Sequence, residues 1–556
     1  MKDTKRMILS MVAAGWAAMS ANATVCIIPA PRELEVRSGG FHAPADFFEK
    51  SPAWECDASL PPEGYTLDVS ETGVSISAAD AAGAFYAVQT LRQLAPTNSQ
   101  GLTLRQIADL RRKVSRDSVE TPGLGEVALR ILRDVRGSYC AIWPIPCVRI
   151  RDWPRYPWRA MMLDEARTFF GKHAVLDMID RMAEYKMNLF HWHLTDDQGW
   201  RIDVPGFPEL VKYGATRKAS VLWHTGPAYP NGYDKPQECI LNGQQYGPYF
   251  YTQEDVAEIL AYAKARHVKV VPEIEFPGHA RALLAAHPEF SCMGESLPRT
   301  PRCELRIEKD VVCGGNLDFY PFMEKLLDAV CEMFPESRII HIGGDECFGE
   351  RWKTCPKCQA LMKKENLSNE RALQSRMTLH FAKYLNSKGR KIIGWDGILT
   401  GAPLDTSGTL VYFRHPRPGS RAKTAGEAAA LGHDVVTIRT QDVYFNYSQG
   451  IDDDPNYYYG CFGSVKVRLA DVYACDPMLG VAPEHAARML GAEGMIWSGT
   501  VSDRHDLEWK TWPRAIALAE ALWSGENRPG FDDFARRLAP QRRRLVKEGL
   551  GCAPLK

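Results

Sequence analysis

Residues 338–346 read Arg338-Ile339-Ile340-His341-Ile342-Gly343-Gly344-Asp345-Glu346, a short apolar run that ends in two glycines and two adjacent acids. Adjacent side chains on a strand point to opposite faces, so two acids that serve one substrate require the strand to end before them. The two glycines permit that bend. The same charges also suit a solvated loop, and this stretch alone does not decide between the two interpretations.

Seven further short apolar runs share this character, and helical stretches separate most of them. One helical stretch starts with a capping-box pattern, Thr252-x-x-Asp255, and another repeats Leu373, Met377 and Phe381 at helical spacing. Eight such alternations predict an α/β fold, a (β/α)8 TIM barrel, rather than an open doubly wound sheet. The eight predicted strands are 160–163, 188–194, 268–274, 338–342, 391–395, 409–413, 434–438 and 494–497.

A smaller α+β domain is predicted before the barrel. Residues 65–69 alternate between apolar and polar as a half-buried strand does, and the spacing becomes helical over 80–94. A Pro- and Trp-rich stretch, 153–158, marks the boundary. We expect a signal peptide over 1–23, an N-terminal α+β domain over 24–150 and the barrel catalytic domain over 151–556.

The amino end predicts export. Basic residues precede a mostly apolar stretch from Met7 to Met19, and Ala21-Asn22-Ala23 has the small-x-small pattern of a cleavage site. We expect a periplasmic, cell-surface or secreted protein with no transmembrane segment after cleavage, because a span needs about 20 apolar residues. The 68 Lys and Arg equal the 68 Asp and Glu, which argues against nucleic acid as a partner.

The residues that follow the strands carry the chemistry, because the active site of such a barrel lies at the carboxyl ends of its strands. Indole rings stack on the C–H faces of a sugar, and carboxylic acids protonate a glycosidic oxygen. Acids, a histidine and tryptophans at one mouth therefore predict a sugar site. They stand at five of the strand ends: Asp196, His279, Asp345, Glu346, Trp395 and Trp497.

Four motifs on the second to fifth strands occur in a fixed order. They are His191-Trp192-His193-Leu194-Thr195-Asp196-Asp197-Gln198-Gly199-Trp200-Arg201, Pro272-Glu273-Ile274-Glu275-Phe276-Pro277-Gly278-His279, His341 to Glu346, and Gly394-Trp395-Asp396. Together they closely resemble the β-N-acetylhexosaminidases of glycoside hydrolase family 20. The resemblance runs from about Ala79 to Trp523 and includes motifs of the smaller domain.

The resemblance implies an exo-acting enzyme that removes terminal β-linked GlcNAc or GalNAc from glycans with retention. In this family the 2-acetamido group of the substrate is the nucleophile and forms an oxazolinium intermediate, an exception to the usual scheme of two carboxylates. By similarity Glu346 is the general acid and base, Asp345 orients the acetamido group, and Tyr444 donates to the acetamido oxygen. The resemblance implies no cofactor and no metal in the active site.

Other positions match the substrate-binding residues of the family. By similarity Trp395 and Trp497 wall the acetamido pocket, Arg159 grips hydroxyls at the far end of the sugar, and Asp196 and His279 support the acid. For Glu273 and Glu275 we expect a supporting role. The full set of expected substrate-binding residues is Arg159, Asp196, His279, Trp395, Phe413, Asn446 and Trp497.

Three positions depart from the family pattern. Phe413 stands where a third pocket tryptophan is expected, Asn446 replaces a carboxylate, and Gly499 replaces a glutamate. In the family both acids contact the outer hydroxyls of the sugar. Their loss suggests the hypothesis that the chain accepts a sugar that carries a sulfate there, because two carboxylates would repel that charge.

Two alternatives to the leading function stay open at the sequence level. His191 and His193 share one face of a strand and could bind a metal, as in metal-dependent barrel hydrolases. The departures at Asn446 and Gly499 instead allow a catalytically impaired homologue that only binds sugar.

The cysteines leave a further alternative open. Cys355-Pro356-Lys357-Cys358, with Cys347 eight residues before it, could belong to a zinc site or form a local disulfide, and we favour a structural role over a metal. The 15 cysteines of the chain are an odd number, so at least one is free, metal-bound or intermolecular if the others pair.

Overall fold

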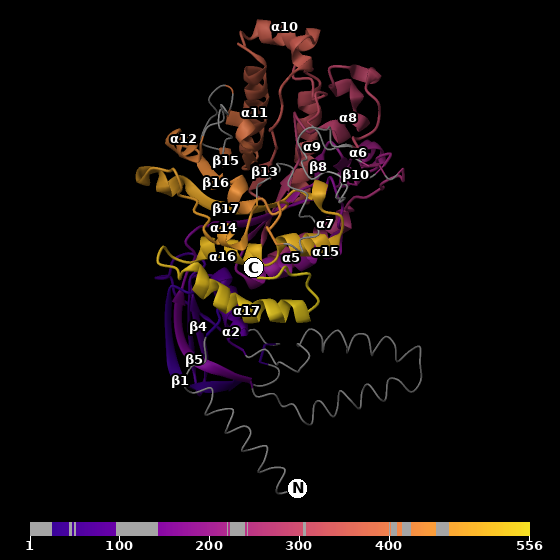
Figure 1. Ribbon diagram of the computed structural model, residues 1–556. Coiled ribbons are helices and arrows are strands. Elements are labelled where there is room, and N and C mark those ends of the chain that lie inside the picture. Colours follow the sequence, from indigo (N-terminus) through magenta and orange to yellow (C-terminus); the bar gives the residue numbers. More distant parts are fainter. Residues whose placement is uncertain are drawn as a thin grey trace, which may run out of the picture. The chain divides into compact units, whose positions relative to one another are not determined.

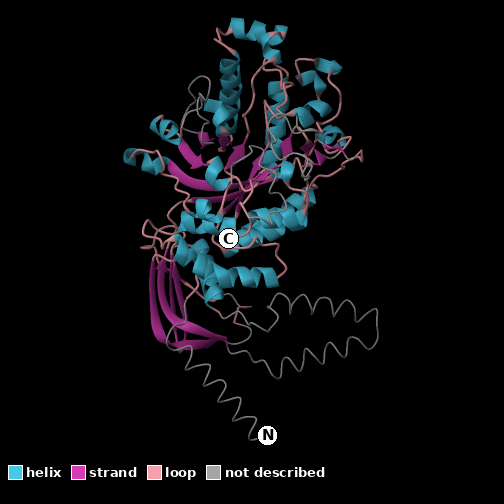
Figure 2. Cartoon of the chain, in the orientation of Figure 1, coloured by secondary structure: helices cyan, strands magenta, loops and turns pink. Residues whose placement is uncertain are grey.

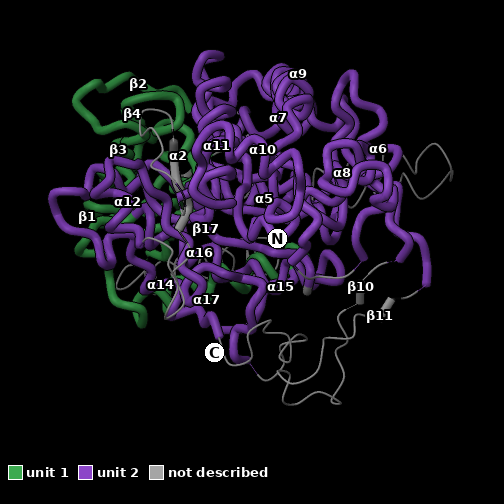
Figure 3. Tube along the Cα trace, turned by 90° about the horizontal axis from the view of Figure 1, so that it is seen from above, with its two compact units in different colours: residues 1–155, 524–550 green, residues 156–523, 551–556 purple. Residues whose placement is uncertain are grey.

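The computed structural model describes residues 25–43, 47–48, 52–95, 143–219, 221–222, 240–241, 243–303, 307–399, 401, 409–413, 424–451 and 466–555 (Figure 1). The predicted signal peptide, 1–23, lies outside these residues. The contacts divide the chain into two compact units, which are residues 1–155 with 524–550 and residues 156–523 with 551–556 (Figure 3).

The second unit contains a closed barrel of eight parallel strands (Figure 2). The last strand pairs with the first over Gly491 to Ile496, which closes the ring. This confirms the predicted (β/α)8 barrel, and every predicted strand overlaps an observed one. The strands are β6 (Trp158–Asp164), β7 (Leu189–His193), β12 (Lys269–Glu273), β13 (Ile339–His341), β14 (Lys391–Gly394), β15 (Thr409–Phe413), β16 (Asp434–Thr437) and β17 (Met489–Ile496).

The barrel strands are rich in apolar residues because they are covered on both faces. All seven residues of β6 are buried, as are all five residues of β7. Strands of parallel sheets are buried on both faces in this way, and their sequences therefore lack the alternation of a half-exposed strand.

Helices follow most of these strands. The Thr252 side chain accepts a hydrogen bond from the Asp255 N–H and the Asp255 side chain accepts one from the Thr252 N–H, so the predicted capping box is present. In α11 the row Leu373, Met377 and Phe381 is buried as its spacing predicted. The main barrel helices are α5 (Lys172–Glu184), α7 (Gln253–Lys264), α9 (Phe319–Met333), α11 (Glu370–Ser387), α12 (Ala425–Ala430), α14 (Leu469–Tyr473), α15 (Arg504–Thr511) and α16 (Arg514–Trp523).

Short elements lie in the loops between strands and helices. They are β8 (Thr195–Asp196), β9 (Gly199–Trp200), α6 (Pro208–Gly214), β10 (Val221–Leu222), β11 (Ile240–Leu241), α8 (Arg281–Ala286), η1 (Pro288–Phe290), η2 (Gly294–Ser296), η3 (Arg351–Lys353), α10 (Pro356–Lys364), η4 (Asp396–Leu399), α13 (Thr440–Val443), η5 (Pro483–Arg488) and η6 (Ser498–Thr500).

In the residues that the structure describes, the first unit is a five-stranded sheet with two helices, α2 (Ala81–Leu94) and α17 (Phe531–Lys547). The strand order is β1 (Glu33–Ala43), β5 (Trp143–Asp152), β3 (Tyr65–Ser70), β4 (Gly73–Ala78) and β2 (Glu55–Cys56). The predicted strand and helix appear as β3, with alternating burial, and α2 (Ala81–Leu94), which Asp80 caps. These elements make the α+β domain that the sequence predicts.

Helix α17 (Phe531–Lys547) also belongs to the first unit, although the sequence analysis grouped it with the barrel. Its Arg537 donates to the Ile27 carbonyl at 2.8 Å, and Gln541 donates to the Cys26 carbonyl at 3.1 Å. Among the described residues, no helix combines the length and the apolar character that a bilayer span needs.

Candidate active site

The adjacent acids Asp345 and Glu346 lie on a sharp bend after β13. Gly343 and Gly344 have φ values of 66° and 97°, so the predicted bend at the two glycines is present. Glu346 itself has a φ of 46°, a left-handed conformation that costs a non-glycine residue about 1–3 kcal/mol. The Glu346 side chain is 29% exposed and that of Asp345 is 9% exposed. The bend therefore leaves Glu346 accessible at the mouth of the barrel.

Hydrogen bonds with residues that follow β12 and β14, and with helix α11, hold the bend. Glu275, which follows β12, accepts from the Gly344 N–H at 2.8 Å, and Gln374 donates to the Gly344 carbonyl at 2.6 Å. The Trp395 N–H donates to the Gly343 carbonyl at 2.9 Å. These contacts fix the backbone from which both acids project.

His279 contacts both acids. Its Nε2 atom lies 3.3 Å from Oε2 of Glu346 and 3.8 Å from Oδ1 of Asp345, while its Nδ1 atom lies 3.1 Å from Oδ2 of Asp197 and 3.3 Å from Oδ1 of Asp196. Burial opposes the imidazolium, but the charges of Asp196 and Asp345 raise the pKa of His279 well above its ordinary value. A protonated imidazole therefore faces Glu346.

Asp196 lies behind this histidine. It contacts Nε2 of His193 at 3.0 Å and Nη2 of Arg167 at 2.6 Å. Burial would raise its pKa, but Arg167 and His279 hold the pKa of Asp196 well below its usual range. The structure thus brings Asp196, His279 and Glu346 into one chain of contacts, as the sequence analysis expects of a support network.

Glu273 is the centre of a buried histidine cluster. Its carboxylate contacts His191 Nε2 at 3.0 Å, His341 Nδ1 at 2.8 Å and His193 Nδ1, and His191 Nδ1 contacts Glu493 at 2.7 Å. Burial would lower the pKa of His191 and His193, but the carboxylates raise them to about 9 and about 10.

The same cluster bears on the metal-hydrolase alternative. The side chains of His191 and His193 are 0% and 1% exposed, and both nitrogens of each ring face a carboxylate. A catalytic metal keeps an open coordination position for water or substrate. A site this enclosed does not offer one, so the geometry favours the supporting role that we expect of Glu273.

Trp395 and Trp497 form an aromatic wall beside the acids. Their ring centroids lie 5.4 Å apart with an interplanar angle of 49°. The Trp395 indole donates to Glu275 Oε2 at 3.2 Å. Burial and the neighbouring charges of Asp345 and Glu273 raise the pKa of Glu275 well above its ordinary value. Glu275 therefore orients a wall residue and holds the bend, which is a supporting role.

The structure contradicts the expected contact between Arg159 and the sugar. Arg159 is the second residue of β6, so it lies at the amino end of the strand, away from the mouth. It is fully buried, and its guanidinium donates to the carbonyls of Lys186 and Tyr156 at 2.8 Å each. Its role is to tie together the closed end of the barrel.

Arg167 occupies the position that was expected of Arg159. It follows the carboxyl end of β6, its side chain is 14% exposed, and it contacts Asp164 at 3.2 Å as well as Asp196. Its guanidinium carbon lies 5.2 Å from the centroid of the Trp497 ring. The sequence could have identified Arg167 as the arginine at the mouth of the barrel, because it comes three residues after the last residue of β6.

Tyr444 and Asn446 lie in the segment after α13, whereas Phe413 lies at the end of β15. Tyr444 follows α13 and forms a backbone bridge with Met495 of β17, and its side chain is buried. The Asn446 side chain is also buried, and its Oδ1 atom has no hydrogen-bond partner among the described residues. Phe413 is the last residue of β15, and its side chain lies outside the part that the structure describes.

Both parts of the chain match known profiles. Residues 156–526 match "Glycosyl hydrolase family 20, catalytic domain", and residues 48–153 match "Glycosyl hydrolase family 20, domain 2".

Three relatives illustrate the similarity. A "Beta-hexosaminidase" of Porphyromonas gingivalis is 34% identical over 499 residues, which are 89% of this chain and 55% of the relative. A "Beta-hexosaminidase" of Akkermansia muciniphila is 29% identical over 533 residues, which are 95% of this chain and 92% of the relative. A solved structure of a mutant Streptomyces plicatus β-hexosaminidase in complex with product GlcNAc has a TM-score of 0.71 and 26% identity, and the match covers 96% of this chain and 97% of that one. The chain therefore spans about half the length of the first relative and nearly all of the other two.

Proposed function

Because this chain belongs to glycosyl hydrolase family 20, we propose that it is an exo-acting β-N-acetylhexosaminidase that removes terminal β-linked GlcNAc or GalNAc from glycans. The relatives that carry β-hexosaminidase names and the GlcNAc complex of one of them support this. The observation that carries the proposal is the bend that places Asp345 and Glu346 beside His279 and the Trp395–Trp497 wall.

In the proposed reaction the sugar supplies its own nucleophile. The acetamido oxygen attacks the anomeric carbon and forms an oxazolinium ion, while Glu346 gives its proton to the departing glycosidic oxygen. Asp345 accepts a hydrogen bond from the acetamido N–H and balances the positive charge that develops. A nucleophile that is already tethered has a very large effective concentration, so the protein needs mainly to hold it beneath the anomeric carbon.

The second step restores the enzyme. The Glu346 carboxylate takes a proton from water, and this water attacks the anomeric carbon and opens the oxazolinium ring. Two attacks on opposite faces give net retention of configuration. His279 stands against Glu346 and is a positioning residue in this scheme, because its imidazolium stabilises the carboxylate that remains after the first proton transfer.

Arg167, which its ion pair with Asp196 holds in place, is the proposed contact to the outer hydroxyls of the sugar. The ion pair lies at the carboxyl end of the barrel, next to Trp497. A grip on the far end of the terminal sugar favours exo action, since an internal sugar carries a substituent there.

The test uses two aryl β-N-acetylglucosaminides, one with a good and one with a poor leaving group. Glu346→Gln should lower kcat/KM on the poor leaving group by about 10²- to 10⁴-fold, and less on the good one, because a good leaving group needs little protonation. Glu350→Gln, an exposed acid four residues further on, is the matched control and should keep its activity. Equal losses on both substrates would contradict the role of Glu346.

The same assay separates the alternatives. A wild-type chain that binds GlcNAc by calorimetry but hydrolyses neither substrate would support the sugar-binding homologue. A His191→Gln variant whose activity is restored by an added divalent metal would support the metal-dependent hydrolase, which the proposal does not allow.

We also propose that the chain is exported after cleavage of residues 1–23. The proposal rests on the basic, apolar and small-x-small pattern of these residues. Amino-terminal sequencing of protein from the native host should find a start near Thr24, and a start at Met1 would contradict it.

A further inference from the structure

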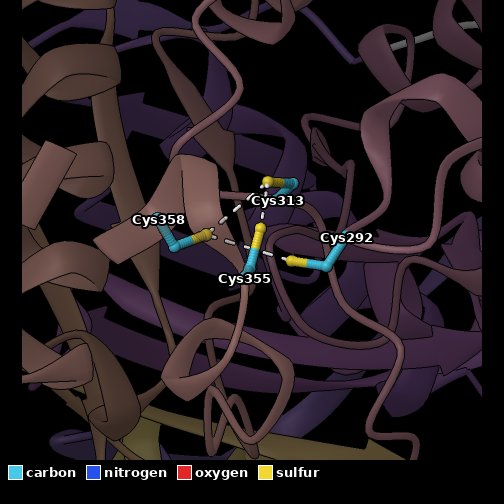
Figure 4. Close-up of side chains that lie close together, drawn as sticks. All are labelled: Cys292, Cys313, Cys355 and Cys358. Carbon is cyan, nitrogen blue, oxygen red and sulfur yellow. Dashed lines mark hydrogen bonds between the residues drawn. The ribbon is translucent and has the colours of Figure 1, made fainter. Parts of the chain in front are cut away.

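Four cysteines from three separate segments of the barrel unit converge on one point (Figure 4). Cys292 lies between η1 and η2, Cys313 lies before α9, and Cys355 and Cys358 lie at the start of α10. Their Sγ atoms all lie within 4.8 Å of one another. The separations are 3.5 Å for Cys313–Cys358, 3.6 Å for Cys313–Cys355 and 3.9 Å for Cys292–Cys358.

These separations fit a tetrahedron around one metal ion. With a Zn–S bond of about 2.3 Å, two sulfurs of a tetrahedral site lie about 3.8 Å apart. The three distances above scatter around that value. A disulfide would need its two sulfurs at about 2.0 Å, and all four cysteines have free thiols here.

The surroundings suit thiolates. Cys355 is the residue that precedes α10 and Cys358 lies in its first turn, where the helix dipole stabilises negative charge. The Gly315 N–H points at the Cys358 sulfur at 3.4 Å. A Cβ atom on Gly315 would overlap the backbone of Lys357 and Cys358, so the close approach requires glycine there. Cys313, Cys355 and Cys358 are buried, and buried negative charge needs a cation.

We propose that Cys292, Cys313, Cys355 and Cys358 bind one structural zinc ion. Tetrahedral coordination by four sulfurs selects zinc or iron–sulfur chemistry, and four protein thiolates around a single ion are the usual closed zinc site. In the sequence, Cys355 and Cys358 stand close to Cys347, and for these three we expect a structural role rather than a metal site. Cys347 is buried too, but it is not among the four grouped sulfurs.

The proposed ion joins two loops of the active site. The segment with Cys292 and Cys313 continues from His279, and the segment with Cys355 and Cys358 continues from Glu346. Other contacts join the same segments: Trp352 donates to the Val312 carbonyl at 2.9 Å, and Arg351 contacts Asp310 at 2.6 Å. The ion would therefore brace the loops that hold the acid and its histidine. With four protein ligands it has no open position, so it takes no part in the reaction.

Metal analysis of the purified full chain tests the site. Wild type and the control Cys331→Ser, a half-buried cysteine of α9 outside the group, should hold about one zinc per chain, and Cys313→Ser and Cys358→Ser should hold less than about 0.2. Less than about 0.2 zinc in wild type, iron in place of zinc, or equal zinc in Cys313→Ser and Cys331→Ser would overturn the proposal.

A second measurement uses wild type alone, in case the variants do not fold. Titration with a mercurial reagent in the presence of a zinc indicator should release zinc in proportion to the thiols that react. Peptide mass spectrometry without reduction should find all four cysteines as thiols. Disulfides among these four cysteines, which an exported chain could form, would overturn the proposal.

Discussion

The bend that carries the two acids is tested by Gly343→Ala. An alanine at a φ of 66° costs about 1–2 kcal/mol in backbone strain. Its Cβ atom would also overlap the Glu275 carboxyl group. To make room Glu275 must move, and it then loses its bonds to the Gly344 N–H and the Trp395 indole, at about 0.5–1.5 kcal/mol each. The total loss in the free energy of unfolding is about 2–5 kcal/mol.

Gly389→Ala is the matched control. Gly389 has a φ of 72°, and a Cβ atom there would meet nothing within 4 Å. It should therefore show the backbone strain alone, about 1–2 kcal/mol, and keep its activity. Gly343→Ala should lose activity as well, because a displacement of reacting groups by about 1 Å costs about 10²-fold in rate.

The assay is urea unfolding followed by tryptophan fluorescence, together with kcat/KM on an aryl β-N-acetylglucosaminide. The difference between the two variants isolates the displacement of Glu275. If both variants lose the same stability and Gly343→Ala keeps wild-type kcat/KM, then Glu275 does not hold the bend and the reasoning is refuted.

Three further predictions test the grip, the histidine cluster and the specificity. Arg167→Lys should raise KM and lower kcat/KM by about 10-fold or more, since Lys cannot reproduce the two-pronged contacts of a guanidinium. Arg159→Lys should lower the free energy of unfolding and leave kcat/KM of the folded protein near that of wild type. A larger loss of kcat/KM in Arg159→Lys than in Arg167→Lys would contradict both placements. The folded-state pKa values of His191 and His193 are raised to about 9 and about 10, so protonation of the two imidazoles stabilises the fold fully below about pH 6.5, and this stabilisation is lost as the pH rises toward those values. Unfolding titrations should show the free energy of unfolding fall by up to about 1.4 kcal/mol per pH unit for each imidazole. A His193→Gln variant whose free energy of unfolding changes with pH as that of wild type does would contradict this. If Asn446 and Gly499 admit a sulfate, 6-sulfated N-acetylglucosaminides should be hydrolysed at least as fast as the plain sugar, and a clear preference for the plain sugar would remove the hypothesis.

The barrel could be predicted because each of its strands contains a short run rich in apolar residues. All residues of β6 and β7 are buried and most of them are apolar, so the polar residues that follow these strands mark the strand ends. The bend at Gly343 and Gly344 was also predictable, since two adjacent acids can serve one substrate only if the strand stops before them.

The prediction that Arg159 binds the sugar was wrong, although the position of this residue in the sequence already indicates the opposite end of the barrel. Arg159 stands before the run 160–163, and in a parallel barrel that position is the closed end. The chain direction alone therefore separates Arg159 from Arg167, whereas a match of residue types to a family does not.

The remaining contacts depend on distant parts of the chain. Glu493 reaches His191 across 302 positions, and Cys292 and Cys313 join a C-x-x-C pair that is 42 or more positions away from Cys313. No local sequence pattern predicts either contact, because long stretches of chain separate the partners. Only the closure of the barrel brings such residues together.

The central claim is that the substrate supplies the nucleophile. Aryl β-glucosaminides with N-acetyl, N-fluoroacetyl and N-trifluoroacetyl groups test it most directly, because fluorine withdraws electrons from the attacking carbonyl oxygen and leaves the leaving group unchanged. We predict that kcat/KM falls steeply along this series and that the matching β-glucoside, with a hydroxyl in place of the amide, is not hydrolysed. Equal rates along the series, or rapid hydrolysis of the glucoside, would contradict the claim.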